Sequence, residues 1–288
     1  MTEPIWTSLK LIGWTQEFFA KKGVDAPRLT AELLLAHALS CDRVRLYLDF
    51  DKPLGDPELA RYRDLVRRRV EGEPTAYLVG RKEFFGRPFR VDSRVLVPRP
   101  ETELLVEVAL AALPERGSAL DLCTGSGCIA VSLALGRAGA RVVATDVSEN
   151  ALTLARENAT SLGAVVEFAT GDLWAAVHAG VRFDVIVANP PYIPVIELAG
   201  LSREVRREPC IALDGGPDGL AVLRRIVEVA PTRLQPGGML CVEMHETHVE
   251  VMPRLCREAG FARAEARRDL AGLPRLTVAH MAAAEDPA

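Results

Sequence analysis

Four consecutive residues, Asn189, Pro190, Pro191 and Tyr192, directly follow the apolar run 183–188 and carry groups that can hold a planar NH2. The Asn189 side chain and the Pro190 main chain each offer a carbonyl acceptor. The two prolines fix φ and stiffen the segment, and an aromatic ring such as that of Tyr192 attracts a cation. An amide or aromatic amine is a poor nucleophile because its lone pair is delocalised, and two acceptors on its N–H groups turn that lone pair toward an electrophile. The competing interpretation is a Pro-Pro turn that closes a buried strand.

A glycine-containing segment lies upstream and has the properties of a cofactor loop. It joins a predicted strand to a predicted helix, where glycines let the backbone approach a ligand and the helix N-terminus offers free N–H groups. About twenty residues later Asp146 ends the next predicted strand, where an acid can accept both ribose hydroxyls. The pattern indicates an adenosine-bearing cofactor. The candidate contacts in the loop are Asp121, Cys123, Thr124, Gly125, Ser126 and Gly127.

Residues 125–130 (GSGCIA) also satisfy the dinucleotide fingerprint, so the loop alone leaves nicotinamide cofactors open. Asp121 favours another cofactor, because an acid before the glycine turn would repel a pyrophosphate. The same acid suits the ammonium group of a methionine moiety, directly or through water. The competing interpretation of Asp121 is a polar strand end.

Asp172, Leu173 and Trp174 follow the third predicted strand of this domain, where an adenine edge can be held. Gly171-Asp172 is also ordinary turn chemistry, and Trp174 also suits the core. Open α/β sheets bind ligands at the carboxyl ends of their strands, so the glycine loop, Asp146 and residues 189–192 are expected to converge. That convergence favours S-adenosylmethionine and methyl transfer.

Strand and helix patterns alternate from about residue 101 onward, which is typical of a parallel sheet with helices on both faces. Helical stretches such as 148–162 and 220–229 separate the strands. Residues 261–280 predict two further strands after a last helix. The earlier predicted strands are residues 119–122, 142–145, 165–169, 185–188 and 239–243.

Residues 1–75 carry only helical signals and predict a small bundle. Gly23 is expected to stop the first helix, Asp25 to cap the second, and Asp56-Pro57 to begin a third that ends by Gly72. Within 76–100, aromatic and branched residues flank a glycine turn and predict a β-hairpin linker. The predicted domains are therefore residues 1–75, 76–100 and 101–288.

The composition of the 288 residues, 49% hydrophobic and 26% charged, is that of a soluble globular protein. The net charge of −4 disfavours a general grip on nucleic-acid phosphates. The six cysteines form no CxxC pair and predict reduced thiols rather than a disulfide frame or a metal site. No apolar run approaches membrane-spanning length, and we expect a cytoplasmic protein.

Several segments together resemble the peptide chain release factor glutamine methyltransferases, over nearly the whole chain. The segment 189–192 (NPPY) is shared with several amino-methyltransferases, including DNA adenine enzymes. The segment 97–103 (VPRPETE) is more specific and is more similar to the release-factor group than to the ribosomal-protein glutamine group. The other matching segments are 76–80 (AYLVG) with Glu83-Phe84, the loop 121–127, Glu208-Pro209 and 212–220 (ALDGGPDGL).

The resemblance implies a Rossmann-like methyltransferase domain, with a mostly parallel sheet and a C-terminal antiparallel strand, after a helical domain that helps to recognise the protein substrate. It implies methyl transfer from S-adenosylmethionine to the side-chain amide nitrogen of a glutamine in the GGQ motif of a release factor. The loop around 123–127, Asp146 and Asn189 would contact the cofactor, and Asn189, Pro190, Pro191 and Tyr192 would hold the glutamine. Cys123 departs from the family, which often has glycine there.

The expected partner is a release factor bound by a monomer, without stable nucleic-acid or membrane binding. The rival activities are an N6-adenine methyltransferase acting on nucleic acid, a ribosomal-protein glutamine methyltransferase and a nicotinamide oxidoreductase; a fourth possibility is a binding module without catalysis. A strong general base is not required, because methylation at nitrogen makes the amide acidic. No histidine is expected near Asn189, since His178 precedes the strand and suits a surface turn.

Overall fold

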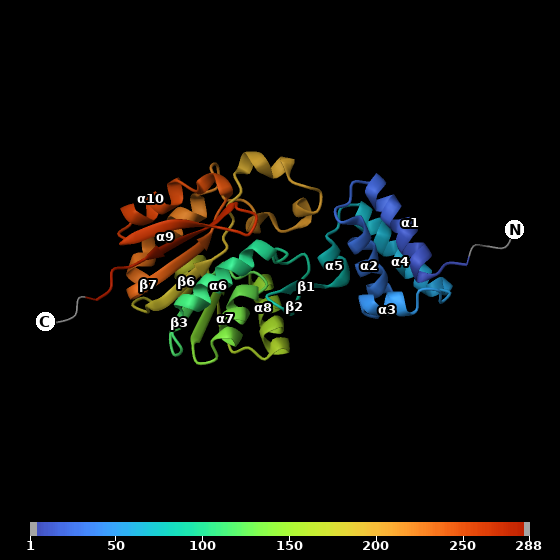
Figure 1. The fold of residues 1–288 in the computed structure, drawn as a ribbon. Helices are drawn as coiled ribbons and strands as arrows, with labels where there is room; N and C mark the ends of the chain where they lie inside the picture. Colours follow the sequence, from blue (N-terminus) through green and yellow to red (C-terminus); the bar gives the residue numbers. More distant parts are fainter. Residues whose placement is uncertain (1–4, 285–288) are drawn as a thin grey trace. The chain divides into compact units, whose positions relative to one another are not determined.

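The computed structural model describes residues 5–284, shown as a ribbon in Figure 1. These residues fall into two compact units. The helical unit holds the described residues up to Arg81 together with Ser202–Arg207, and the sheet unit holds Lys82–Leu201 and the described residues from Glu208 onward.

The helical unit has a core of its own, with Phe19, Leu34 and Leu35 fully buried. Buried Arg69 of this unit forms an ion pair with Glu204, which comes from the short segment Ser202–Arg207. A segment distant in the sequence therefore supplies the carboxylate that neutralises the buried Arg69 charge. Its helices are α1 (Ser8–Lys21), α2 (Pro27–Ala38), α3 (Arg43–Leu48), α4 (Asp56–Val70) and α5 (Thr75–Val79).

Three helix ends test the predicted caps. Gly23 follows α1 with a φ of +70° and stops it as predicted. The predicted cap of α2 is wrong, because Ala26 occupies that position and the Asp25 main-chain carbonyl accepts a hydrogen bond from Thr30 instead. The cap of α4 lies one residue earlier than predicted, at Gly55, whose N–H donates to the Glu58 carboxylate at 2.8 Å. Helices α3 and α5, with 6 and 5 residues, are too short to give a helical period and were missed.

The sheet unit contains a seven-stranded sheet in the order β5-β4-β3-β6-β7-β9-β8. Strands β3 to β7 pair in parallel, and β9 pairs antiparallel with both β7 and β8. The predicted mostly parallel sheet with a C-terminal antiparallel strand is confirmed. Its strands are β3 (Ser118–Leu122), β4 (Arg141–Asp146), β5 (Glu167–Thr170), β6 (Phe183–Ala188), β7 (Leu234–Glu243), β8 (Arg263–Arg268) and β9 (Pro274–His280).

Helices cover both faces of this sheet because successive strand residues point to opposite sides. In β3, Ala119 belongs to one buried cluster, with helices α6, α7 and α8, whereas Leu120 belongs to the other, with α9 and α10. Figure 1 shows α6, α7 and α8 in green and α9 and α10 in orange. These helices are α6 (Glu103–Ala112), α7 (Cys128–Gly136), α8 (Glu149–Leu162), α9 (Ala221–Arg233) and α10 (Val251–Glu258).

The predicted hairpin is present as β1 (Arg81–Phe84) and β2 (Arg87–Arg90), a separate two-stranded sheet. Phe84 and Phe89 lie edge to face at 6.0 Å between ring centroids, and both are buried. All six cysteines have free thiols. Across residues 5–284, no helix combines the length and apolar character needed to cross a membrane.

Candidate active site

A cavity of about 460 Å³ opens in the sheet unit where β3, β4, β5 and β6 end. It brings together residues predicted from four separate segments of the sequence. Asp121, Gly127, Trp174, Pro190 and Tyr192 do not line it. The predicted site residues that do line it are Cys123, Thr124, Gly125, Ser126, Asp146, Asp172, Leu173, Asn189 and Pro191.

The loop between β3 and α7 uses left-handed backbone conformations at three positions. Gly125 and Gly127 have φ angles of +55° and +79°, and a side chain on Gly127 would meet the Ala155 Cβ at 3.0 Å. Cys123 has a φ of +59°, a conformation that costs a non-glycine residue roughly 1 kcal/mol. Glycine, which the family often has at this position, would adopt the same φ without this cost.

Asp146 holds the loop to the end of β4. One carboxylate oxygen, Oδ2, accepts the Gly125 N–H at 2.9 Å, and the other, Oδ1, accepts the Ser148 N–H at 2.9 Å. Burial raises the pKa of Asp146, while the backbone donors oppose that shift. Since a carboxylate has about four lone-pair sites, Asp146 keeps acceptor capacity toward the cavity that it lines.

Asp121 lies fully buried beneath the same loop. Its Oδ2 accepts the Thr124 hydroxyl at 2.6 Å and the Ala130 N–H at 3.2 Å. Within residues 5–284 its Oδ1 has no hydrogen-bond partner, and burial raises the pKa of the carboxyl to about 7. A buried carboxylate with an unpaired oxygen is costly unless a cation or donor reaches it. This oxygen therefore fits an ammonium group, directly or through water.

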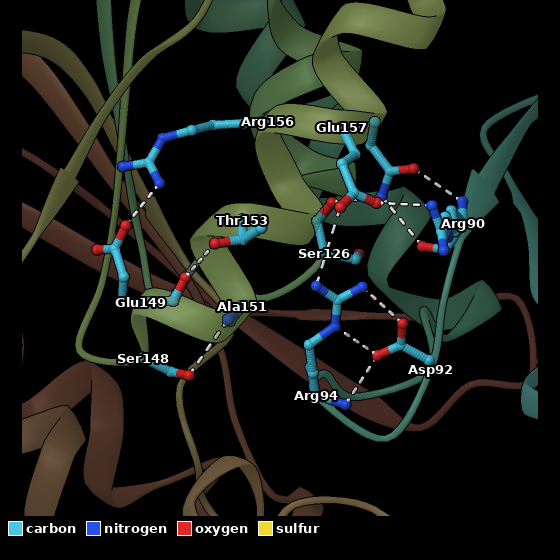
Figure 2. Close-up of polar contacts among 11 residues, drawn as sticks. Arg90, Asp92, Arg94, Ser126, Ser148, Glu149, Ala151, Thr153, Arg156 and Glu157 are labelled. Carbon is cyan, nitrogen blue, oxygen red and sulfur yellow. Dashed lines mark hydrogen bonds and ion pairs between the residues drawn. The ribbon is translucent and has the colours of Figure 1, made fainter.

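Helix α8 joins the β1–β2 hairpin to the loop between β3 and α7, and Figure 2 shows Arg90 and Ser126 close to this helix. Asn158 of α8 donates to the Ser126 carbonyl at 2.9 Å and exchanges two hydrogen bonds with the Arg90 backbone, at 2.8 and 3.0 Å. Arg90 and Arg94 both approach the Glu157 carboxylate in Figure 2. The hairpin, the helix and the loop are thus joined through one buried amide, which the sequence reasoning missed.

In the segment after β5, the two neighbouring candidates for the adenine contact, Leu173 and Trp174, lie in different surroundings. Leu173 lines the cavity and has a φ of +50° at the start of the 3-10 helix η2 (Leu173–Ala176). The Trp174 indole N–H instead donates to the Arg225 carbonyl at 3.0 Å, and its ring packs against the core. Asp172 lines the cavity and pairs with the Arg225 guanidinium at 2.7 Å.

The segment after β6 is tied to a buried carboxyl. The Asn189 side-chain NH2 donates to the Thr102 hydroxyl oxygen at 3.2 Å, and that hydroxyl donates to Glu243 Oε2 at 2.6 Å. The Tyr192 hydroxyl donates to Glu243 Oε1 at 2.9 Å. Glu243 is fully buried at the end of β7, and burial raises its pKa. Burial also raises the pKa of Tyr192 well above its usual value.

Thr102 and Glu243 are missing from the residues predicted for the site, although both carried a usable signal. Thr102 lies within the 97–103 segment, and Glu243 ends a predicted strand, as Asp146 does. The expectation of no histidine near residues 189–192 is wrong, because the His245 ring lies 6.4 Å from that of Tyr192. The sequence distance between them hid this contact. His178 is exposed, as expected.

Comparisons with known proteins show which family the chain belongs to. Residues 10–80 match the family described as PrmC N-terminal domain, and residues 100–198 match the methyltransferase small domain. A release factor glutamine methyltransferase of Geobacter sulfurreducens is 46% identical over 96% of this chain and 98% of its own length. A protein of the same name from Chlorobaculum tepidum is 46% identical over 84% of this chain and 87% of its own.

Two solved structures share the fold. A methyltransferase from Pyrococcus furiosus has a TM-score of 0.53 at 20% identity and covers 75% of this chain and 98% of its own. The T. thermophilus 16S rRNA N2 G1207 methyltransferase, in complex with AdoMet and guanosine, has a TM-score of 0.52 at 20% identity and covers 70% of this chain and 49% of its own. At 20% identity, these two similarities show a shared fold alone.

Proposed function

The chain belongs to the family of release factor glutamine methyltransferases, and we propose that it methylates the side-chain amide nitrogen of a glutamine in the GGQ motif of a peptide chain release factor. The methyl donor is S-adenosylmethionine. One observation carries the proposal on the acceptor side. Asn189 lines the cavity with its NH2 group already engaged by Thr102, so its carbonyl oxygen is available to a substrate NH2.

The residues of the glycine loop and Asp146 would hold the donor. The free Oδ1 of Asp121 suits the ammonium group of its methionine part, and the remaining lone pairs of Asp146 suit the ribose hydroxyls. Leu173 is the better candidate for the adenine contact, because it lines the cavity whereas Trp174 turns to Arg225. When bound, S-adenosylmethionine supplies an electrophilic methyl group, so that an N–C bond forms as the S–C bond breaks and the amide proton leaves to water.

The residues after β6 would prepare the acceptor. Asn189 Oδ1 and the Pro190 carbonyl accept the two N–H bonds of the glutamine amide, which turns its lone pair toward the methyl group. Alignment of the two reactants supplies most of the acceleration. The Tyr192 hydroxyl is held by Glu243, and an aromatic ring beside the amide would stabilise the passing positive charge by ~0.5–2 kcal/mol. Pro191, which lines the cavity, would help to wall the glutamine side chain.

We also propose how the domains share the work and which partners the protein binds. In this proposal residues 1–75 recognise the protein substrate and residues 101–288 carry the methyltransferase chemistry. Residues 76–100 form the linker between these two domains. The match of residues 10–80 to a family-specific N-terminal domain supports this division. The net charge of −4 supports the absence of stable nucleic-acid binding. We further propose a monomer that works in the cytoplasm, where release factors act.

Label transfer tests this function directly. The protein is incubated with labelled S-adenosylmethionine and purified release factor, and in parallel with DNA and with RNA, and the modified site is mapped by peptide mass. We expect label on one glutamine of the release factor, and a Gln→Ala change at that site should abolish it. Salt-sensitive labelling of adenine in DNA or RNA, with an unlabelled release factor, would overturn the proposal in favour of the nucleic-acid rival.

A further inference from the structure

We propose that Glu243 is a positioning residue, which sets the orientation of the Asn189 amide through the hydroxyl of Thr102. The inference rests on the proposed function, because it concerns how the acceptor for the substrate NH2 is aimed. It connects three segments that are far apart in the sequence. These are the 3-10 helix η1 (Pro100–Thr102), the end of β6 and the end of β7.

The first step is the direction of the hydroxyl hydrogens. An ionised carboxylate accepts hydrogen bonds and donates none. The hydroxyls of Thr102 and Tyr192 donate to the two oxygens of Glu243, at 2.6 and 2.9 Å, and both hydrogen bonds favour its ionised form against the burial that raises its pKa. Glu243 is 0% exposed, and no solvent competes for these donors. The single hydroxyl hydrogen of Thr102 is therefore committed to Glu243.

The second step transfers this polarity to Asn189. With its hydrogen committed, the Thr102 oxygen can only accept, so the group of Asn189 that lies 3.2 Å away must be the NH2. The carbonyl oxygen is then the other branch of the planar amide. An amide has nearly the same shape in both orientations, and its hydrogen-bond partners decide between them. The carboxylate of Glu243 thus selects the orientation in which Asn189 offers an acceptor.

The third step is the consequence for the substrate. A glutamine NH2 brings two donors and needs an acceptor at Asn189. The reversed amide would present NH2 to NH2, which removes the grip and leaves donors unpaired. Thr102 also lines the cavity, is 2% exposed and is hydrogen-bonded directly to both Glu243 and Asn189. The 97–103 segment and residues 189–192 therefore act as parts of one acceptor site.

A matched pair of variants at Thr102 tests the relay. Thr102→Val keeps the shape and removes the hydroxyl, whereas Thr102→Ser keeps the hydroxyl. We expect Thr102→Val to lower kcat for release-factor methylation about 30- to 100-fold, in the range caused by small errors of alignment, with KM and the Kd for S-adenosylmethionine changed less than about 3-fold. Thr102→Ser should restore most of kcat. The NMR signals of the Asn189 side-chain NH2 should shift in Thr102→Val and return in Thr102→Ser.

Glu243→Gln provides the second arm. The replacement amide can donate to the Thr102 oxygen, which frees the Thr102 hydrogen to bond Asn189 Oδ1 and reverse the amide. We expect a loss of kcat similar to that of Thr102→Val, and a Thr102→Val/Glu243→Gln double variant no slower than the slower single variant, because both changes break one relay. Thermal melting shows which variants are folded, and the conclusion is drawn from those.

The results of these experiments distinguish a failure of the proposed relay from a failure of the proposed function. A wild-type protein that leaves the release factor unlabelled contradicts the proposed function itself. An active wild type with unchanged kcat in folded Thr102→Val or Glu243→Gln overturns the relay alone. So does a Thr102→Ser variant as slow as Thr102→Val, or a double variant in which the two losses multiply. A slow Thr102→Val, its rescue by Thr102→Ser and non-additive losses support the relay.

Discussion

The proposed donor loop (residues 123–127) and the proposed acceptor segment (residues 189–192) each lie against one fully buried acid, yet the two acids differ in their hydrogen bonds. Glu243, behind residues 189–192, has a hydroxyl donor on each oxygen. Asp121, beneath the donor loop, has two donors on Oδ2 and, among the described residues, none on Oδ1. A buried acid with both oxygens bonded positions its neighbours before any ligand arrives. In our proposal the ammonium group of the methyl donor completes the unpaired oxygen of Asp121, so the two sides should respond differently to mutation.

The largest effect is expected from the acceptor side. Asn189→Ala removes the side-chain acceptor for the substrate NH2 and should lower kcat by about 10²- to 10³-fold, as the loss of one preorganised polar group does in other enzymes. The Kd for S-adenosylmethionine should change far less, since the donor loop is untouched. Steady-state methylation of release factor and calorimetry check the two quantities, with a thermal melt as the control for folding. Near-normal turnover would remove Asn189 from the chemistry.

On the donor side, Asp146→Ala should weaken S-adenosylmethionine binding by about 10- to 100-fold, because it removes charged hydrogen bonds to the ribose and to the loop. At saturating donor the loss of kcat should be smaller. Calorimetry measures the affinity. Glu167→Ala is the matched control, since this carboxylate lies on the neighbouring strand β5, is exposed and pairs with Arg141. Equal affinities for the Asp146→Ala and wild-type proteins would place the ribose elsewhere.

Asp121 should make donor binding depend on pH. Its pKa is raised to about 7, so the carboxyl is mostly neutral below pH 7 and mostly ionised above it. Only the ionised form attracts an ammonium group, so affinity should rise as pH increases through about 7. Asp121→Asn should bind roughly 10-fold more weakly at pH 8, the scale of one charged hydrogen bond, and should lose the pH dependence. Calorimetry at pH 6, 7 and 8 checks this, and a parallel pH dependence in Asp121→Asn would contradict it.

The same acid should cost stability in the protein without ligand. Its pKa when folded lies above the ordinary value of 3.8, so the folded state binds the proton more tightly and loses stability as pH rises from about 4 to above 7. Asp121→Asn removes this penalty and should raise the free energy of unfolding at pH 8 by about 1–3 kcal/mol. Denaturant unfolding of the wild type and the variant at pH 8 measures it. A less stable variant would show that the Asp121 charge is compensated without ligand.

The smallest effects separate Leu173 from Trp174. Leu173→Ala should weaken donor binding about 3- to 10-fold, because it removes apolar surface from the cavity. Trp174→Phe should leave affinity within about 2-fold and instead cost about 0.5–1.5 kcal/mol of stability, through loss of the hydrogen bond to Arg225. Calorimetry and denaturant unfolding of both variants give the comparison. The opposite order of affinities would assign the adenine contact to Trp174.

The sequence reveals the positions of the loop 123–127 and Asp146 but not the partners of Asn189, for a physical reason. The loop 123–127 and Asp146 are defined by their place after a strand, which local patterns reveal, and the sheet order then brings them together. Thr102 and Glu243 are 141 residues apart, and their contact depends on how η1 packs beside β7. The direction of Trp174 depends on the 3-10 turn that begins at Leu173. Such contacts carry no local period, so only the folded chain reveals them.

The identity of the acceptor is the central claim, and a change in the substrate tests it most directly. The enzyme is saturated with labelled S-adenosylmethionine and offered wild-type release factor or a variant in which the mapped glutamine is changed by Gln→Glu. The glutamate has nearly the same shape but lacks the NH2 that Asn189 and Pro190 are proposed to hold. We expect one methyl group per wild-type release factor and none on the variant. Continued labelling of the Gln→Glu release factor would contradict this account of the acceptor site.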